Sequence, residues 1–81
     1  SPALTREVVE DEMVLYMESE AAATGLNWHS IARHMLGLYH GQPGARLWRQ
    51  VWSNHRLRQE KPHVVMQKAQ AQLAAFKYLA D

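Results

Sequence analysis

Apolar residues recur every three or four positions along four stretches of the chain, and no stretch of any length alternates as a strand does. This spacing is typical of helices that bury one side. The predicted helices span approximately residues 5–24, 27–40, 43–55 and 62–80. Since 81 residues suffice for one small core, we expect a single all-α domain over residues 1–81, folded as a small antiparallel four-helix bundle.

Residues with strong positional preferences mark the ends of these helices. Thr5 and Asn27 suit N-cap positions, because their side-chain oxygens can accept from free backbone N–H groups. Pro43 and Pro62 suit the first positions of the third and fourth helices, where no N–H donor is needed. Gly37 lies inside the second predicted helix, where glycine lowers the stability of the helix by about 1 kcal/mol relative to Ala. We therefore expect a facing backbone to approach Gly37 closely.

The apolar stripes also predict the core. The tryptophans of the third helix are expected to be buried and not to act as base-stacking platforms, because a small bundle needs their area. The expected core residues are Val9, Met13, Tyr16, Met17, Trp28, Ile31, Met35, Leu38, Leu47, Trp48, Val51, Trp52, Val65 (or Met66), Ala69, Leu73, Phe76 and Ala80, and the apolar faces are widened by Val8, Leu15, Leu36 and Tyr39.

The net charge of +1 conceals opposed blocks of charge. Residues 1–27 hold one base and six acids, a net of −5. Residues 28–63 hold six bases and one acid, a net of +5, together with all five histidines. The acids of the first helix are expected to form a solvated outer face, with a docking surface for a partner domain as the alternative. The segregation predicts a domain whose basic side meets a polyanion.

Several classes of function find no support in the residues. Without cysteine, the segment has no disulfide framework, thiolate metal site or cysteine nucleophile. No two histidines have the i, i+4 spacing of a helical metal site, so we expect none. Ser30 and Ser53 lack the context of a nucleophile, so we expect no catalytic residue here. No apolar run reaches the roughly 18 residues of a membrane span, and no signal peptide opens the chain, which is compatible with a cytoplasmic protein.

Phosphate binding is the site chemistry that the residues favour. Arg33, Arg46 and Arg49 flank the joint between the second and third helices, and Arg is a planar, permanently charged phosphate ligand. The basic stretch continues through the next loop with Arg56, Arg58 and Lys61. From the residues alone, a solvated basic face with one or two arginines paired to acids of the first helix fits equally well.

The joint itself carries a resemblance to a known family. Arg33-His34-Met35-Leu36-Gly37-Leu38, an aromatic residue at 39, Gly41, Pro43-Gly44-Ala45-Arg46 and Trp48-Arg49 resemble the C-terminal helical domain of bacterial tRNA-dihydrouridine synthases of the A type. The match is dense over residues 31–49, and residues 5–16 suit the helix that opens that domain.

The resemblance implies a function for the segment. In that family a separate N-terminal barrel holds FMN and reduces uridines of the tRNA D-arm. NADPH returns the flavin to its reduced form. The helical domain binds the tRNA backbone. We therefore expect a C-terminal fragment of a larger flavoenzyme, with no cofactor in this segment and with tRNA and the barrel as its partners. By position, the resemblance implies a tRNA-facing role for Arg33, His34, Arg46 and Arg49.

Two other functions remain open from the sequence. The short glycine-rich joint would also suit a helix-turn-helix DNA-binding domain, although the apolar residues of the third helix leave few positions for a major groove. A helical bundle that binds another protein through the acidic first helix is the other alternative.

Overall fold

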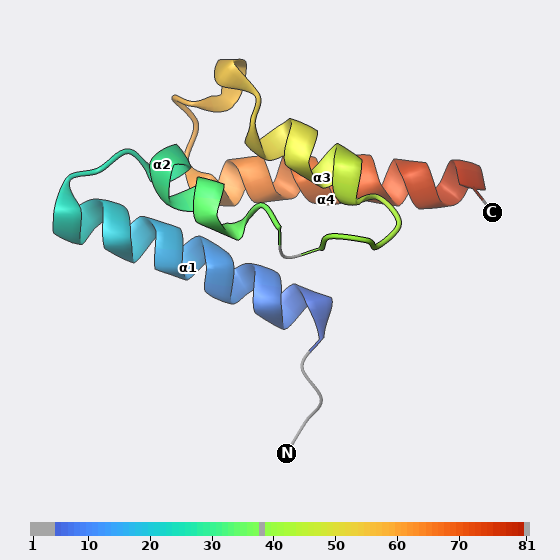
Figure 1. Ribbon diagram of the computed structural model, residues 1–81, viewed down its shortest axis with the longest axis horizontal. Helices are drawn as coiled ribbons and strands as arrows, with labels where there is room; N and C mark the ends of the chain where they lie inside the picture. The colour runs from blue at the N-terminus through green and yellow to red at the C-terminus, as the bar shows by residue number, and fades with distance from the viewer. Residues whose placement is uncertain (1–4, 38, 81) are drawn as a thin grey trace.

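The computed structural model describes residues 5–37 and 39–80, which form helices joined by turns (Figure 1). No strand occurs among these described residues, so the all-α prediction is confirmed. Leu38 and the side chain of Ala80, both predicted to be in the core, lie outside the described residues. The helices are α1 (Arg6–Thr24), α2 (Trp28–Ala32), η1 (Arg33–Met35), α3 (Ala45–Trp52), η2 (His55–Leu57) and α4 (Pro62–Ala80), of which η1 and η2 are single 3₁₀ turns.

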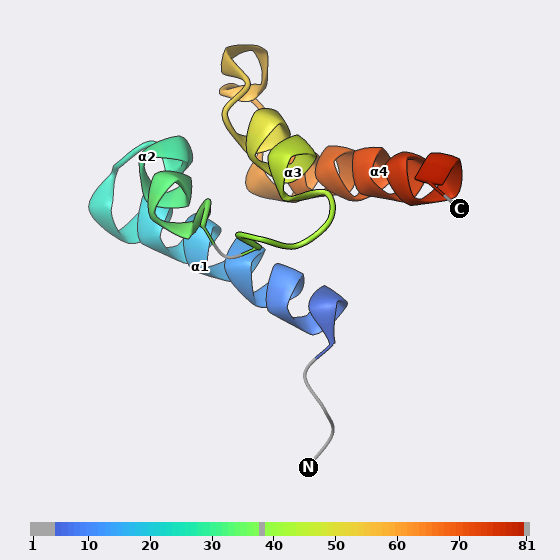
Figure 2. The same ribbon diagram turned by 45° about the vertical axis from the view of Figure 1, so that its right-hand side comes forward.

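The helices associate in two pairs. α2 packs on α1, and α3 packs on α4, while α1 and α4 also touch (Figures 1 and 2). α1 and α4 have 19 residues each, whereas α2 has five and α3 has eight. At 1.5 Å per residue, the long helices extend about 28 Å and α2 only about 8 Å. The predicted antiparallel four-helix bundle is not confirmed, because two of the four helices are too short to run alongside the others.

The predicted N-caps are confirmed. The backbone N–H of Val8 donates to Oγ1 of Thr5 over 3.2 Å. Oδ1 of Asn27 accepts from the backbone N–H of His29 over 3.3 Å. α4 begins at Pro62, as predicted. These caps satisfy N–H groups that the first turn of a helix leaves without a partner.

The second and third helices are shorter than predicted. The second was expected to reach residue 40, but its α-helical part ends at Ala32 and η1 ends at Met35. Successive turns follow, in which the backbone N–H groups donate to carbonyl groups three residues earlier. α3 begins at Ala45 and not at Pro43, because Gly44 has a left-handed φ of 85°, outside the helical region.

Two further details of these helices differ from the prediction. α3 ends at Trp52 and not at residue 55, because the backbone is extended at Asn54, which caps the separate turn η2. The expectation that a backbone approaches Gly37 is wrong, since a β-carbon there would have no atom within 4 Å. Close approach occurs instead at Gly44, where a β-carbon would lie 2.5 Å from Cδ2 of Leu73.

Aromatic side chains form the centre of the core. Trp48 is 1% exposed, and its ring meets Tyr39 edge-on with centroids 4.8 Å apart. Trp52 lies between Trp48, at 5.7 Å, and Trp28, at 5.6 Å. This row of four rings, here called the aromatic row, connects α2, α3 and the joint between them. The burial predicted for the tryptophans is confirmed.

Not every predicted core residue is buried. Tyr16 is 52% exposed, and Phe76, Val8 and Leu15 are also exposed. All four were assigned to apolar faces by helical spacing alone. Spacing identifies the side of a helix but not how far a neighbouring helix extends along it. The short α2 and α3 leave parts of the long helices uncovered.

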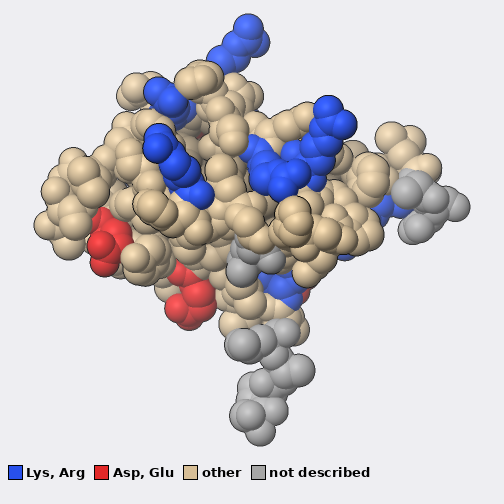
Figure 3. Space-filling view, in the orientation of Figure 1, with Lys and Arg blue, Asp and Glu red and all other residues tan. Residues whose placement is uncertain are grey.

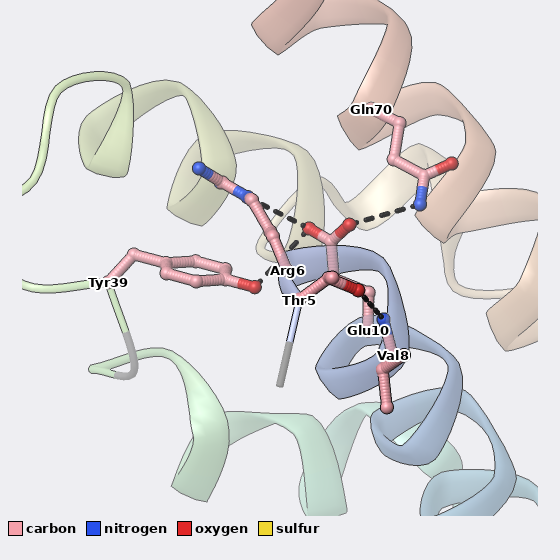
Figure 4. Close-up of polar contacts among 6 residues, drawn as sticks. All are labelled: Thr5, Arg6, Val8, Glu10, Tyr39 and Gln70. Carbon is pink, nitrogen blue, oxygen red and sulfur yellow. Dashed lines mark hydrogen bonds and ion pairs between the residues drawn. The ribbon is translucent and has the colours of Figure 1, made fainter. Parts of the chain in front are cut away.

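Glu10 is buried, so the prediction that the acids of the first helix form a solvated face is wrong at this residue. Its side chain is only 3% exposed and lies within a polar network (Figure 4). Arg6 Nε donates to Oε2 of Glu10 over 3.2 Å, and the Tyr39 hydroxyl donates to the same oxygen over 3.3 Å. Gln70 Nε2 donates to Oε1 over 3.1 Å. A buried carboxylate is tolerated when it is hydrogen-bonded in this way, and the network ties α1 to α4 and to the joint.

Candidate nucleic-acid interface

The residues predicted to bind nucleic acid lie on short elements in the middle of the chain. Arg33 and His34 belong to η1, Arg46 and Arg49 to α3, Arg56 to η2, and Arg58 and Lys61 to the loop before α4. We call these seven residues the basic surface. All are exposed except Arg49, which is half-buried. Figure 3 shows Lys and Arg side chains gathered over the upper part of one face and acidic side chains at its lower left, over α1.

No described ion pair involves the basic surface. The described residues form two ion pairs, one between Arg6 and Glu10 and one between His63 and Glu18. The alternative in which arginines of the basic surface pair with acids of α1 therefore has no support in the described contacts. Cationic side chains of this kind can neutralise the phosphates of a polyanion, which releases the cations bound to it.

Four groups that carry or can carry positive charge line one cleft within this region. The cleft has a volume of about 240 Å³. His29 and Arg33 come from α2 and η1, and His55 and Arg58 come from η2 and the residue after it. Arg33 and Arg58 were predicted from the sequence, whereas His29 and His55 were not. The spacing of His29 four residues before Arg33, and of His55 three before Arg58, is the signal that could have found them.

The protonation of His29 is controlled by this cleft. Burial lowers the pKa of His29, and the charges of Arg58, Arg33 and then His55 lower it further. Its Nδ1 lies 2.5 Å from Oδ1 of Asn27, which also accepts from the backbone N–H of His29. Because this oxygen can only accept, Nδ1 carries a proton and Nε2 is the nitrogen that titrates.

A hydrogen bond connects the two segments of the chain that line the cleft. The indole Nε1–H of Trp28 donates to the backbone carbonyl oxygen of Glu60 over 2.8 Å. This bond ties the start of α2 to the loop that follows η2. Arg33, just after α2, and Arg58, two residues before Glu60, therefore lie on segments that this bond connects.

The remaining residues of the basic surface lie outside this cleft. Arg46 and Arg49 project from α3, and His34 and Arg56 are exposed on their own 3₁₀ turns. Lys61 lines a different hollow, next to Trp28 and His63. Of the seven residues of the basic surface, only Arg33 and Arg58 therefore line the cleft, together with His29 and His55, and the other five are separate charges around it.

The described part of the chain contains neither a cluster of metal ligands nor a helix able to span a membrane. No group of three or more His, Cys, Asp or Glu side chains within residues 5–37 and 39–80 is placed to hold a metal ion. None of the described helices combines the length and the apolar character that crossing a membrane requires.

Comparison with known proteins identifies relatives of one kind. The chain is 36% identical over 73 residues to a tRNA-dihydrouridine(20/20a) synthase of Vibrio parahaemolyticus, covering 90% of this chain and 22% of the relative. It is 36% identical over 69 residues to that of Pseudomonas syringae pv. tomato, covering 85% and 20%. It is 35% identical over 78 residues to that of Vibrio cholerae, covering 96% and 23%.

The chain corresponds to only one part of each of these relatives. No protein-family model matches the chain, and no solved structure matches it. The chain spans no more than 23% of the length of these three relatives. The resemblance found in the sequence is nevertheless confirmed, and the chain is homologous to a segment of the tRNA-dihydrouridine synthases.

Proposed function

We propose that this chain is the tRNA-binding helical domain of a bacterial tRNA-dihydrouridine synthase, placed at the C-terminal end of a longer cytoplasmic protein. The domain binds the tRNA backbone, so that a D-arm uridine reaches the flavin on a separate barrel domain. FMN and NADPH belong to that other part of the parent enzyme, and no residue of this chain is assigned to either cofactor.

The observation that carries the proposal is the charge of the basic surface. Seven side chains that carry or can carry positive charge lie on short elements between α2 and α4, and none takes part in a described ion pair. Arginine donates two parallel hydrogen bonds to a phosphate and remains charged at every relevant pH. Folded RNA is bound largely through its shape and its phosphates, which suits exposed arginines without a deep base pocket.

Titration of the 81-residue chain with tRNA at several salt concentrations tests the proposal. About five phosphate contacts would give a slope of roughly −3.5 to −4.5 for log K against log salt, because bound cations are released. A matched titration with duplex DNA of equal charge is the control, and tRNA should compete for the domain more strongly. A nearly flat salt response would refute the proposal, and a preference for DNA would favour the helix-turn-helix alternative.

The remaining alternative, a bundle that binds another protein, predicts a different result. A protein complex formed through α1 would survive high salt and nuclease treatment. The burial of Glu10 inside the α1 network removes one of the acids that such a surface would use. The tRNA-binding function is therefore the one that the geometry supports best.

A further inference from the structure

The cleft differs from the rest of the basic surface because basic side chains from two separate segments of the chain line it together. His29 and Arg33 face it from α2 and η1, and His55 and Arg58 face it from η2 and the residue after it. No carboxylate lines it, and Ser53 adds a hydroxyl group. At about 240 Å³, its volume accommodates a tetrahedral oxyanion with bound water.

We propose that this cleft is a specific site for one phosphate group of the RNA backbone, held by Arg33 and Arg58 and completed by protonated His29. The inference rests on the proposed function, since it names the place where the domain would hold one particular phosphate. It assigns His29 and His55 to the interface, and it distinguishes one convergent site from the isolated contacts that Arg46 and Arg49 would make.

The protonation of His29 follows from the geometry of the cleft. Without an anion, burial and the charges of Arg58, Arg33 and His55 lower the pKa of His29, so its imidazole is neutral near pH 7. A bound phosphate reverses the local charge and favours the imidazolium. Because Nδ1–H already donates to Asn27, the added proton goes from solvent to Nε2, which becomes a further donor for the anion. Anion affinity at this cleft therefore rises as pH falls.

NMR titration of the imidazole resonances tests the inference directly. The probe is sulfate, whose charge stays constant between pH 5.5 and 8, added to the 81-residue chain. Sulfate should raise the pKa of His29, while the resonances of His40, outside the cleft, should shift only as far as the change in ionic strength requires. Arg33→Gln and Arg58→Gln should each weaken sulfate binding by about tenfold, the size expected for one charge-assisted hydrogen bond. Lys68→Gln removes the same charge from the exposed side of α4 and should leave sulfate binding unchanged.

A second measurement uses tRNA and separates this inference from the function it rests on. His29→Gln should weaken tRNA binding several-fold at pH 6 and much less at pH 8, with the circular dichroism spectrum unchanged. If wild-type tRNA binding is salt-dependent but sulfate shifts no cleft resonance, the cleft inference is wrong and the proposed function stands. If sulfate binds the cleft but tRNA does not bind the domain, the proposed function fails and the cleft is an anion site for another ligand. Equal responses of His29 and His40 to sulfate would also overturn the cleft as a specific site.

Discussion

The guanidinium carbon of Arg6 lies 4.0 Å from the centroid of the Tyr39 ring. The same carbon lies 6.0 Å from the ring of Trp48, so Arg6 contacts one end of the aromatic row while its Nε donates to Glu10. Contacts between a cation and an aromatic ring are worth about 0.5–2 kcal/mol, depending on exposure. Arg6 thus joins the first turn of α1 to the joint that precedes α3, and it fixes where that joint passes.

We expect Glu10→Gln to destabilise the fold by about 2–3 kcal/mol, because it leaves the partly buried Arg6 without its counter-charge and alters the bonds from Tyr39 and Gln70. Urea denaturation followed by circular dichroism measures this change. Glu12→Gln, at an exposed position of the same helix, is the matched control and should change stability by less than about 0.5 kcal/mol. Equal effects of the two substitutions would mean that the network contributes nothing.

The raised pKa of Tyr39 should make the stability of the fold depend on pH in the alkaline range. Burial raises the pKa of Tyr39 above its ordinary value of 10.0, and the nearby carboxylate of Glu10 raises it further, against an opposing effect of Arg6. A raised pKa in the folded state means that the unfolded chain loses this proton first as pH increases. The stabilisation is therefore complete below pH 10 and decreases as pH rises through the folded-state pKa.

Denaturation curves between pH 8 and 11 test this prediction. Tyr39→Phe should be less stable than the wild type at pH 8, because the bond to Glu10 is lost, and the difference should shrink at pH 11. Tyr78→Phe, at a highly exposed position of α4, should follow the wild type throughout. A constant difference between Tyr39→Phe and wild type would contradict the shift of this pKa.

Two glycines on either side of the joint should respond differently to alanine. Gly44→Ala should cost about 1–3 kcal/mol, since φ is 85° there and the new β-carbon would lie 2.5 Å from Leu73. Gly37→Ala should be neutral or stabilise by up to about 1 kcal/mol, because its surroundings are open and its φ is not positive. Thermal unfolding of both variants measures the contrast, and similar melting temperatures would show that Leu73 does not constrain the turn.

Substitutions on α3 should alter the salt dependence of tRNA binding. Arg46→Gln and Arg49→Gln should each reduce the slope of log K against log salt by about 0.7–0.9, the amount expected for one lost phosphate contact. Lys77→Gln, on α4, removes one charge as a control. If neither α3 substitution changes the slope of log K against log salt, these two arginines do not contact phosphates, whatever the affinity of the wild type.

The sequence predicts the long helices better than the short elements between them. Thr5, Asn27 and Pro62 act through their own backbone and side-chain chemistry, so a local pattern suffices to place them. The end of α2 at Ala32 depends instead on how the joint turns, and helical spacing continues past it without a break. The prediction failed where a nearby segment, and not the local sequence, decides the conformation.

The same distinction applies to the candidate site. Clusters of arginine are visible in the sequence, so candidate phosphate ligands could be named residue by residue. The buried Glu10 could not be, since its partners Tyr39 and Gln70 lie 29 and 60 positions away. The convergence of His29 with Arg58 depends likewise on the contact between α2 and the loop after η2.

The aromatic row also affects how this domain can evolve. Trp28, Trp48 and Trp52 are buried, whereas nearly all the basic side chains that neighbour them along the chain are exposed. Positions that determine charge are therefore almost entirely distinct from positions that determine shape. Under the proposed function, successive substitutions can change which nucleic acid the domain prefers while the fold persists, provided that the indole rings are kept.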